Sequence, residues 1–433
     1  MPATSGCWSR PERVAGADAV VVGAGAAGIA AARRLQEAGL DVLLVEAGNR
    51  LGGRAYSVRI EDMTVDLGCG WLHSARRNPW TELAGHYGFT VDRSPANWST
   101  QWRDLGFPPA ERHAYHEAWM RWEEAAHAAL TGPDQPLSAF IAPDDPWRPL
   151  IDAVSGYVNG APLSRVSLHD WAAYEDSATE DNWAVREGYG TLVARHAEGL
   201  AVRLDTIVTC IDHRAQTVRV ETSRGTIETR RVIVCVPSTM LTGERITFDP
   251  PLPDKHAAAT ALPLGLADKL FLHVDGTDLP DNGHLIGNPY SACTASYRLG
   301  PFGLPLIECF FGGDCAEALE TDGDGAAADF AISELVALLG SDWRARLIPV
   351  AATRWRAEPH IHGSYSHAHV GAVPQRAVLA APVEDRLFFA GEACSTHDFS
   401  TAHGAFQTGV AAADAVIGTL PFRSRFTAPA SLA

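Results

Sequence analysis

The clearest pattern of hydrophobic positions lies near the start of the chain. An apolar run at residues 19–22 predicts a buried strand, and the small, apolar and basic residues that follow predict a helix that ends at Gly39. A second apolar run at residues 42–45 predicts another buried strand. Strand, helix and strand in this order form a βαβ unit, the repeating unit of an open parallel sheet.

The turn between the first strand and the helix carries Gly23, Gly25 and Gly28, the GxGxxG spacing. The first glycine permits a tight turn, the second lets the backbone approach a pyrophosphate, and the third allows the helix to pack closely on the strand. Glu46 ends the second strand, where its carboxylate can accept a hydrogen bond from a ribose hydroxyl. Since every part of the motif is in place, the sequence predicts a dinucleotide site.

A second glycine turn follows, and it contains Gly53 and ends at Arg54. The guanidinium of Arg54 can grip a phosphate through two parallel hydrogen bonds. This addition favours FAD over NAD as the dinucleotide.

Beyond this unit, two segments with a different pattern are inserted between stretches that continue the alternation of strands and helices. Helices rich in Trp, His and acidic residues are predicted at residues 78–148, and alternating strands with a hairpin turn at 202–237. A second excursion contains a stretch at residues 263–272 that includes Lys269, a predicted strand at 306–311 and an amphipathic helix at 326–339. We therefore predict an α/β fold, in which a discontinuous Rossmann-like FAD-binding domain is joined to an α+β substrate-binding domain.

The predicted bounds follow these changes of pattern. The N-terminal tail is 1–17, the FAD-binding domain is 18–77, 187–240 and 383–420, the substrate-binding domain is 78–186 and 241–382, and the C-terminal tail is 421–433. In the first excursion we expect most of the aromatic side chains to be core and one or two to line a substrate channel; the candidates are Trp98, Trp102, Trp119 and Trp122.

Charge and cysteine usage narrow the function classes. The net charge of −17 argues against nucleic acid or an anionic membrane as a partner and is compatible with a cationic substrate, although acidity also serves solubility alone. The eight cysteines lack CxxC spacing, so we expect reduced thiols, with no disulfide framework and no metal site. No run reaches transmembrane length, and we expect a cytoplasmic monomer or homodimer.

Only two of the 35 basic residues are lysines, Lys255 and Lys269. Because the chain uses arginine nearly everywhere else, a lysine is expected where chemistry requires a compact ammonium. Taken alone, Lys269 could also be a surface residue paired with Asp268.

The ordered set of motifs resembles the FAD-dependent amine oxidases, the group of monoamine oxidases, polyamine oxidases and flavin-dependent histone demethylases. The resemblance covers about residues 18–418 and rests on Gly23 to Arg54, Gly68 to His73, Gly188-Tyr189-Gly190, Val234 to Pro237, Lys269, Trp355, Gly363 to Ser366 and Gly391 to Ala405. The block FSTAHGAFQTG and the turn Gly70-Trp71-Leu72-His73 look most like polyamine and spermine oxidases. Such enzymes oxidise a C–N bond to an imine, which water hydrolyses, and pass the electrons to O2 to yield H2O2.

The resemblance implies a role at the cofactor for several residues. Glu46 is expected at the adenosine ribose, Arg54 and Glu392 at the pyrophosphate and ribityl region, and the backbone of Val208 at the adenine. The other residues of the cofactor site are Gly53, Gly70, Trp71, Trp355, Gly391, Thr401 and Ala402. A helix that begins near His403 would aim backbone donors at the flavin.

The resemblance also implies a catalytic set of Lys269, Tyr365, His73 and Trp355. Lys269 matches the lysine that holds a water near the flavin, Tyr365 matches one wall of an aromatic cage around the amine, and Trp355 packs on the flavin. An aromatic face recognises a cation and also disfavours its charge, which helps because the neutral amine is the form oxidised. Taken alone, Trp355 and Tyr365 would be interpreted as core residues.

Three positions depart from the monoamine oxidases. Ser364 stands where they carry the cysteine that bonds the flavin, so non-covalent FAD is expected. Thr401 replaces the second cage tyrosine, which leaves a one-sided cage. Gly48 replaces an arginine near the phosphates.

We therefore predict an FAD-dependent oxidase with two small-molecule substrates, O2 and an amine, with polyamines or similar secondary amines preferred. Glu187 or the acids between Asp176 and Asp181 are candidates to anchor a distal ammonium. One alternative is an L-amino-acid oxidase or a specialised biosynthetic amine oxidase, which would need an arginine beside the flavin. Another is a flavin-binding module without turnover or a desaturase-like relative; the presence of Lys269 and Tyr365 argues against the module.

Overall fold

The opening βαβ unit forms as predicted. β1 (Val14–Val22) pairs in parallel with β2 (Val42–Val45), and α1 (Ala26–Glu37) connects them. The computed structural model describes residues 14–243, 245–276 and 279–420. β1 thus begins inside the predicted N-terminal tail 1–17, whose first thirteen residues lie outside the described part, as does the predicted tail 421–433.

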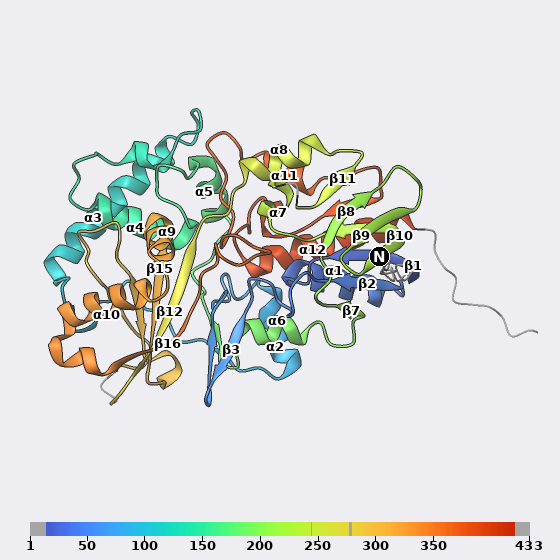
Figure 1. Cartoon of the computed structure of the whole chain (residues 1–433). Coiled ribbons are helices and arrows are strands. Elements are labelled where there is room, and N and C mark those ends of the chain that lie inside the picture. The colour runs from blue at the N-terminus through green and yellow to red at the C-terminus, as the bar shows by residue number, and fades with distance from the viewer. Residues whose placement is uncertain (1–13, 244, 277–278, 421–433) are drawn as a thin grey trace, which may run out of the picture.

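The larger sheet takes its eight strands from three distant stretches of chain (Figure 1). Its order is β11-β8-β9-β10-β1-β2-β7, and β17 also pairs with β10. β10 is parallel to β1 and β17 but antiparallel to β9. It therefore belongs both to the parallel part of the sheet and to its antiparallel part. The added strands are β7 (Val202–Arg203), β8 (Val208–Asp212), β9 (Val218–Thr222), β10 (Gly225–Val234), β11 (Thr247–Asp249) and β17 (Leu387–Phe389).

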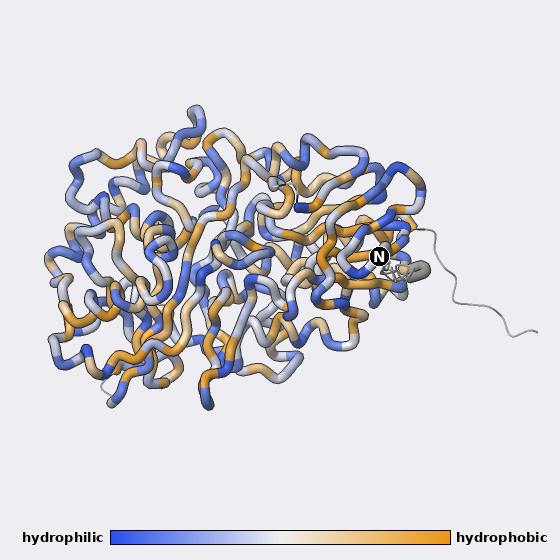
Figure 2. Tube along the Cα trace, in the orientation of Figure 1, coloured by the Kyte–Doolittle hydropathy of each residue, from blue (hydrophilic) through white to orange (hydrophobic). Residues whose placement is uncertain are grey.

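Helices cover both faces of this sheet, which explains the nearly continuous apolar runs of its central strands. One face packs on α1 and α12 (Ala402–Thr419) and the other on α7 (Ser238–Thr242), α8 (Pro253–Ala261) and α11 (Gln375–Ala380). In Figure 2 the strands carry apolar residues and the outermost loops are mostly hydrophilic. Gly409 lets α12 approach α1, because a Cβ at that position would lie 2.2 Å from the carbonyl oxygen of Ala27.

The second sheet is antiparallel, with the order β13-β14-β15-β12-β16. Its strands are β12 (Ala267–Val274), β13 (Gly283–Ile286), β14 (Ser296–Leu299), β15 (Leu306–Gly312) and β16 (Leu347–Ala352). One face packs on α9 (Gly313–Thr321) and α10 (Ala326–Leu339). The opposite face forms a wall of the cavity described below.

A helical segment completes this half of the molecule. It contains α3 (Pro109–Ala128), α4 (Arg148–Asn159) and α5 (Leu168–Glu175). Its aromatic core includes Trp122, Trp147 and Trp171, whereas Trp98 and Trp119 line the cavity, in line with the expected division into core and channel aromatics. α2 (Pro79–Tyr87), α6 (Tyr189–Arg195) and the short strands β3 (Ser57–Ile60), β4 (Met63–Asp66), β5 (Val91–Asp92) and β6 (Ala184–Val185) bridge the two halves. The exact domain bounds stay a prediction.

The prediction of reduced cysteines was wrong for one pair. Cys293, between β13 and β14, forms a disulfide with Cys315 in α9, and their Cα atoms are 4.7 Å apart. The two cysteines are 22 residues apart, a spacing typical of no motif, and only the packing of α9 against the sheet brings them together. The other described cysteines are free thiols, and Cys7 lies outside the described residues. The cytoplasmic location stays a prediction. The disulfide does not support it, because the location was predicted together with reduced thiols.

Within residues 14–243, 245–276 and 279–420, no helix is long and apolar enough to cross a membrane. In the same part of the chain, no group of three or more His, Cys, Asp or Glu side chains could hold a metal ion.

Candidate functional site

One cavity of about 1170 Å³ brings the predicted site residues together. This volume exceeds the range of about 300–1,000 Å³ typical of small-ligand sites. The predicted residues that line it are Gly23, Gly25, Glu46, Gly53, Arg54, Gly70, Trp71, His73, Val208, Lys269, Trp355, Tyr365, Gly391, Glu392, Thr401 and Ala402. Gly28 lies behind the wall, where a Cβ would come within 1.8 Å of the Gly23 carbonyl oxygen and 3.3 Å of Val21, so it serves packing as predicted.

The edge of the parallel sheet supplies one end of the cavity. Gly25 is the N-cap residue of α1, and Gly23 has φ +99°, where a Cβ would meet the Cys235 carbonyl oxygen at 2.5 Å. Glu46 leaves β2 beside them, and its carboxylate accepts from the amides of Ala24 at 2.7 Å and Gly48 at 2.8 Å. An acid held next to a helix N-terminus suits a ribose followed by a pyrophosphate.

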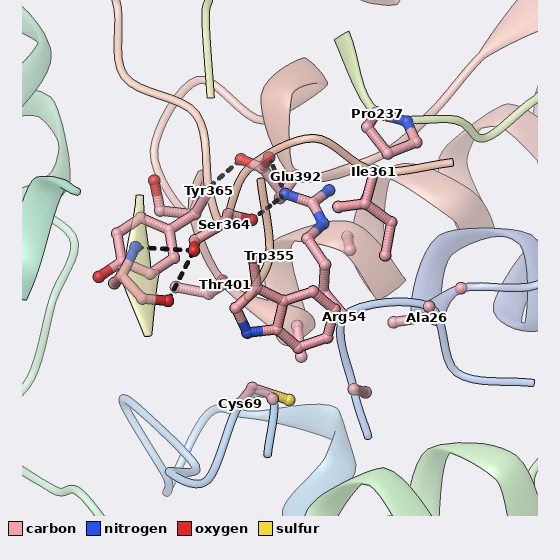
Figure 3. Close-up of a pocket in the computed structure, with 18 of the residues that line it drawn as sticks. Ala26, Arg54, Cys69, Pro237, Trp355, Ile361, Ser364, Tyr365, Glu392 and Thr401 are labelled. Atoms are coloured by element: carbon pink, nitrogen blue, oxygen red, sulfur yellow. Dashed lines mark hydrogen bonds and ion pairs between the residues drawn. The ribbon is translucent and has the colours of Figure 1, made fainter. Parts of the chain in front are cut away.

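An ion pair between Arg54 and the buried Glu392 lines the cavity (Figure 3). Arg54 Nη1 donates to Glu392 Oε1 at 2.8 Å and to the Ser364 carbonyl oxygen at 2.6 Å. Glu392 also accepts from the Ser366 hydroxyl at 2.7 Å and the Ser400 amide at 2.9 Å. Burial favours the neutral acid, but Arg54 and Ser366 outweigh it and hold the pKa of Glu392 below its usual value.

A second helix N-terminus faces the same space. The Thr401 hydroxyl caps α12 by accepting from the Gly404 amide at 2.9 Å, and Ala402 lines the cavity. Gly391 has φ +140°, and a Cβ there would meet no atom within 4 Å, so its backbone borders open space. Two helix N-termini, an acid at the end of β2 and the flat Trp355 ring fit the adenosine, pyrophosphate and flavin of FAD.

Lys269 is held in the wall of the same cavity. Its Nζ donates to the Asp66 carbonyl oxygen at 2.9 Å and lies 2.8 Å from Glu308 Oε1. The residue is 7% exposed, so the interpretation as a surface lysine is wrong. Gly70 makes room for it, because a Cβ at that position would lie 3.1 Å from Nζ. Sequence reasoning missed Glu308, since a single acid in an apolar strand carries no motif.

Asp268 points away from Lys269 and anchors Trp355 instead. Its Oδ1 accepts from the Thr353 hydroxyl at 2.7 Å and the Trp355 amide at 3.0 Å. Burial, together with the neighbouring Glu320, raises the pKa of Asp268 to about 7.

Tyr365 and His73 are fixed by hydrogen bonds in the cavity wall. The Tyr365 hydroxyl donates to the Tyr157 carbonyl oxygen, and burial raises its pKa. His73 Nδ1 lies 2.6 Å from Asn182 Oδ1, an acceptor, so Nδ1 carries the proton and Nε2 is the free acceptor. Desolvation lowers the pKa of His73 to about 4, and the ring is therefore neutral at physiological pH.

The cavity opens beside α3, α4 and α5. Trp98, Met120 and Val158 line it and are 45%, 49% and 48% exposed, which marks its mouth. Glu175, the exposed last residue of α5, lines the same region. It directly precedes the acids predicted to anchor a distal ammonium.

The acids that the sequence proposed for that role lie outside the cavity. Glu187 accepts from the Thr90 amide and hydroxyl, each at 2.8 Å, and Asp181 lies 3.2 Å from Arg76. Glu187 and Asp181 therefore serve structural contacts.

Comparison with known proteins agrees with this geometry. The sequence family described as "Flavin containing amine oxidoreductase" matches residues 26–132 and 133–417. Polyamine oxidase 4 of Oryza sativa subsp. japonica is 29% identical over 432 residues, which covers 91% of this chain and 87% of that protein. Lysine-specific histone demethylase 2 of Homo sapiens is 25% identical over 447 residues, covering 90% of this chain and 52% of that protein.

A solved structure shows the same fold. Putrescine oxidase bound to putrescine aligns with a TM-score of 0.75 and 20% sequence identity, covering 94% of this chain and 100% of that chain. The predicted α/β architecture with a Rossmann-like FAD domain is thereby confirmed. The chain belongs to the flavin-containing amine oxidoreductases, a family of FAD-dependent enzymes that oxidise amines.

Proposed function

We propose that this amine oxidase acts on a polyamine or a similar secondary amine, with O2 as the electron acceptor and H2O2 as the product. The observation that carries the proposal is the position of Glu175 at the mouth of a cavity whose inner wall holds Tyr365. A carboxylate at the mouth attracts a second ammonium, while the aromatic face further in receives the nitrogen to be oxidised. Two relatives named polyamine oxidase, from Oryza sativa and Arabidopsis thaliana, support this substrate class.

The chain's own residues hold the cofactor and prepare the amine. Bound FAD supplies the acceptor for the electron pair of the C–H bond next to nitrogen and passes it to O2. Glu46, Arg54 and the N-termini of α1 and α12 bind its polar groups. Tyr365 is kept in place by its bond to the Tyr157 carbonyl, and its apolar face favours a neutral amine.

His73 contributes a hydrogen-bond acceptor to this arrangement. Because its pKa is lowered to about 4, the ring is neutral at neutral pH and Nε2 carries no proton. Nε2 can instead accept a hydrogen bond from the amine N–H and so orient the nitrogen, which makes His73 an orienting group and not a general base.

Non-covalent attachment of FAD is part of the same proposal. The Ser364 hydroxyl donates to the Ala267 carbonyl oxygen at 2.7 Å and accepts from the Ala267 amide at 2.8 Å, so it is engaged in holding β12. Acid precipitation of the holoenzyme should therefore leave all the flavin in the supernatant, and flavin that stays with the protein would contradict the proposal.

The contacts of Arg298 bear on the alternative that the enzyme is an L-amino-acid oxidase. It lines the cavity, as a carboxylate-binding arginine would, but its Nε donates to Asn282 Oδ1 at 2.7 Å and its Nη1 lies 3.8 Å from Glu308 Oε2. A substrate carboxylate would have to compete with Glu308, which makes the amino-acid reading weaker.

The test is H2O2 release from spermine, spermidine and their N-acetyl forms, compared with L-amino acids and a monoamine. Glu175→Gln should raise KM for substrates with a second ammonium and leave KM for the monoamine unchanged. If none of the polyamines reacts while an L-amino acid does, the proposal is wrong.

A further inference from the structure

Neighbouring strands of the second sheet place charged side chains on one face, toward the cavity. Lys269 stands on β12, Glu308 on β15 and Arg298 on β14. The strand register puts Arg298 directly opposite Glu308, and Phe310 opposite Lys269. Residues two apart on a strand point to the same face, so Glu308 is a diagonal neighbour of Lys269.

The contact between Lys269 and Glu308 is close and shielded from water. Nζ lies 2.8 Å from Glu308 Oε1, and the two side chains are 9% and 12% exposed. The second anchor of Nζ is the Asp66 carbonyl oxygen at 2.9 Å, which is neutral. Among the residues that the structure describes, Glu308 is the carboxylate that forms an ion pair with this ammonium.

Arg298 adds a second cation to the network. Its Nη1 lies 3.8 Å from Glu308 Oε2, and its guanidinium packs 4.5 Å over the Trp71 ring. Burial favours the neutral acid, but Lys269 and Arg298 together hold the pKa of Glu308 below its usual value. One carboxylate, Glu308, is thus shared by two cations.

We propose that Glu308 is a positioning residue that fixes the Lys269 ammonium on the cavity wall, with Arg298 as the second cation of the same network. Removal of the carboxylate takes away the ion-pair partner of the Lys269 ammonium and a counter-charge of Arg298, in a place largely enclosed from water. That the anchored ammonium serves the oxidation of an amine rests on the proposed function.

The near absence of lysine from this chain gives a direct test that needs no substrate. Protein labelled with 15N-lysine shows only two side-chain nitrogens, Lys255 and Lys269. In the holoenzyme variant Glu308→Gln, the chemical shift of the Lys269 side-chain nitrogen should change, because the ammonium loses its carboxylate partner. Lys255 is the internal reference, because its Nζ donates to the carbonyl oxygens of Val378, Leu379 and Ala381.

Glu175→Gln is the matched control, since it removes a carboxylate from the same cavity but from α5, outside the second sheet. It should leave the Lys269 signal in place. Glu308→Asp keeps the charge on a shorter side chain and should give an intermediate shift of the Lys269 signal. This variant replaces Glu308→Gln in the test if Glu308→Gln does not fold. A Lys269 signal that is the same in the parent and in both Glu308 variants would overturn the proposal.

A double-mutant cycle distinguishes positioning from direct contact with the amine. Glu308→Gln should slow anaerobic flavin reduction about tenfold, within the range of coupled neighbours. In a Lys269→Met background the same change should cost less than about twofold, because Glu308 acts through the lysine. Equal losses in the two backgrounds would refute the proposal, whereas a failed polyamine assignment would leave the nitrogen signals as predicted.

Discussion

A buried ion pair between Arg376 and Asp170 supports the residues of the FAD site, and removal of one partner tests this support. Arg376 Nε donates to Oδ1 at 2.7 Å and Nη2 to Oδ2 at 2.8 Å, and the side chains are 0% and 1% exposed. Arg376 Nη1 also donates at 2.9 Å to the Ser366 hydroxyl, which in turn contacts Glu392. The pair therefore ties α5 and α11 to the carboxylate that holds Arg54.

Arg376→Met is expected to leave the Asp170 carboxylate buried and without its counterion. Loss of one partner from such a pair costs about 3–5 kcal/mol. An unfolding entropy of about 2.1 cal/mol/K per residue over 433 residues corresponds to about 0.9 kcal/mol per degree, so the melting temperature should fall by about 3–6 °C. Thermal unfolding followed by fluorescence, in excess FAD, measures this shift.

Two further variants decide whether the reasoning holds. Asp170→Asn combined with Arg376→Met should be more stable than Arg376→Met alone, because no uncompensated charge stays buried. Arg59→Met is the matched surface control, since Arg59 lies 3.0 Å from Asp62 with both side chains largely exposed, and it should not shift the melting temperature measurably. An Arg376→Met variant as stable as this control would refute the argument.

The remaining predictions concern the catalytic wall. Tyr365→Phe should retain the aromatic face and lose only the bond to the Tyr157 carbonyl, with a several-fold lower kcat, whereas Tyr365→Leu should cost about tenfold more, measured by H2O2 release. The pKa of Asp268 is raised to about 7 in the folded state, above its unfolded value. The parent should therefore lose stability relative to Asp268→Asn as the pH rises from about 4 to 7, with no further loss above pH 7. A difference in melting temperature that stays constant over this range would contradict the prediction. Gly70→Ala should displace Lys269 and slow flavin reduction without loss of bound FAD, and an unchanged rate would show that the 3.1 Å approach is relieved elsewhere.

Contiguous motifs were predictable because their geometry is local. In the stretch from Gly23 to Glu46, the spacing of residues fixes the turn, the helix start and the strand end, and these place the glycines and the acid at one edge of the sheet. In the second half, the strand at 306–311 and the helix at 326–339 were also predicted from periodicity, and they correspond to β15 and α10.

Partners that meet across the fold left no signal in the sequence. Asp268 and Lys269 are adjacent in the chain, yet the alternation of β12 sends them to opposite faces, where one anchors Trp355 and the other meets Glu308. The same holds for Cys293 with Cys315, whose meeting depends on how α9 packs on the sheet. The prediction for the acid at the cavity mouth was also wrong, since Glu175 lines the cavity and the predicted acids do not. The position at which α5 ends decides which acid faces the opening, and the sequence alone does not show it.

By itself, the sequence determined the dinucleotide motif, the α/β architecture and, through the resemblance of its ordered motifs, FAD and amine oxidation. The tertiary structure decided which charges stand together at the cavity: Glu308 and Arg298 beside Lys269, and Glu175 at the mouth. The physical reason is register, since a shift of one residue between β12 and β15 would turn Glu308 into the apolar core and leave Lys269 without its carboxylate.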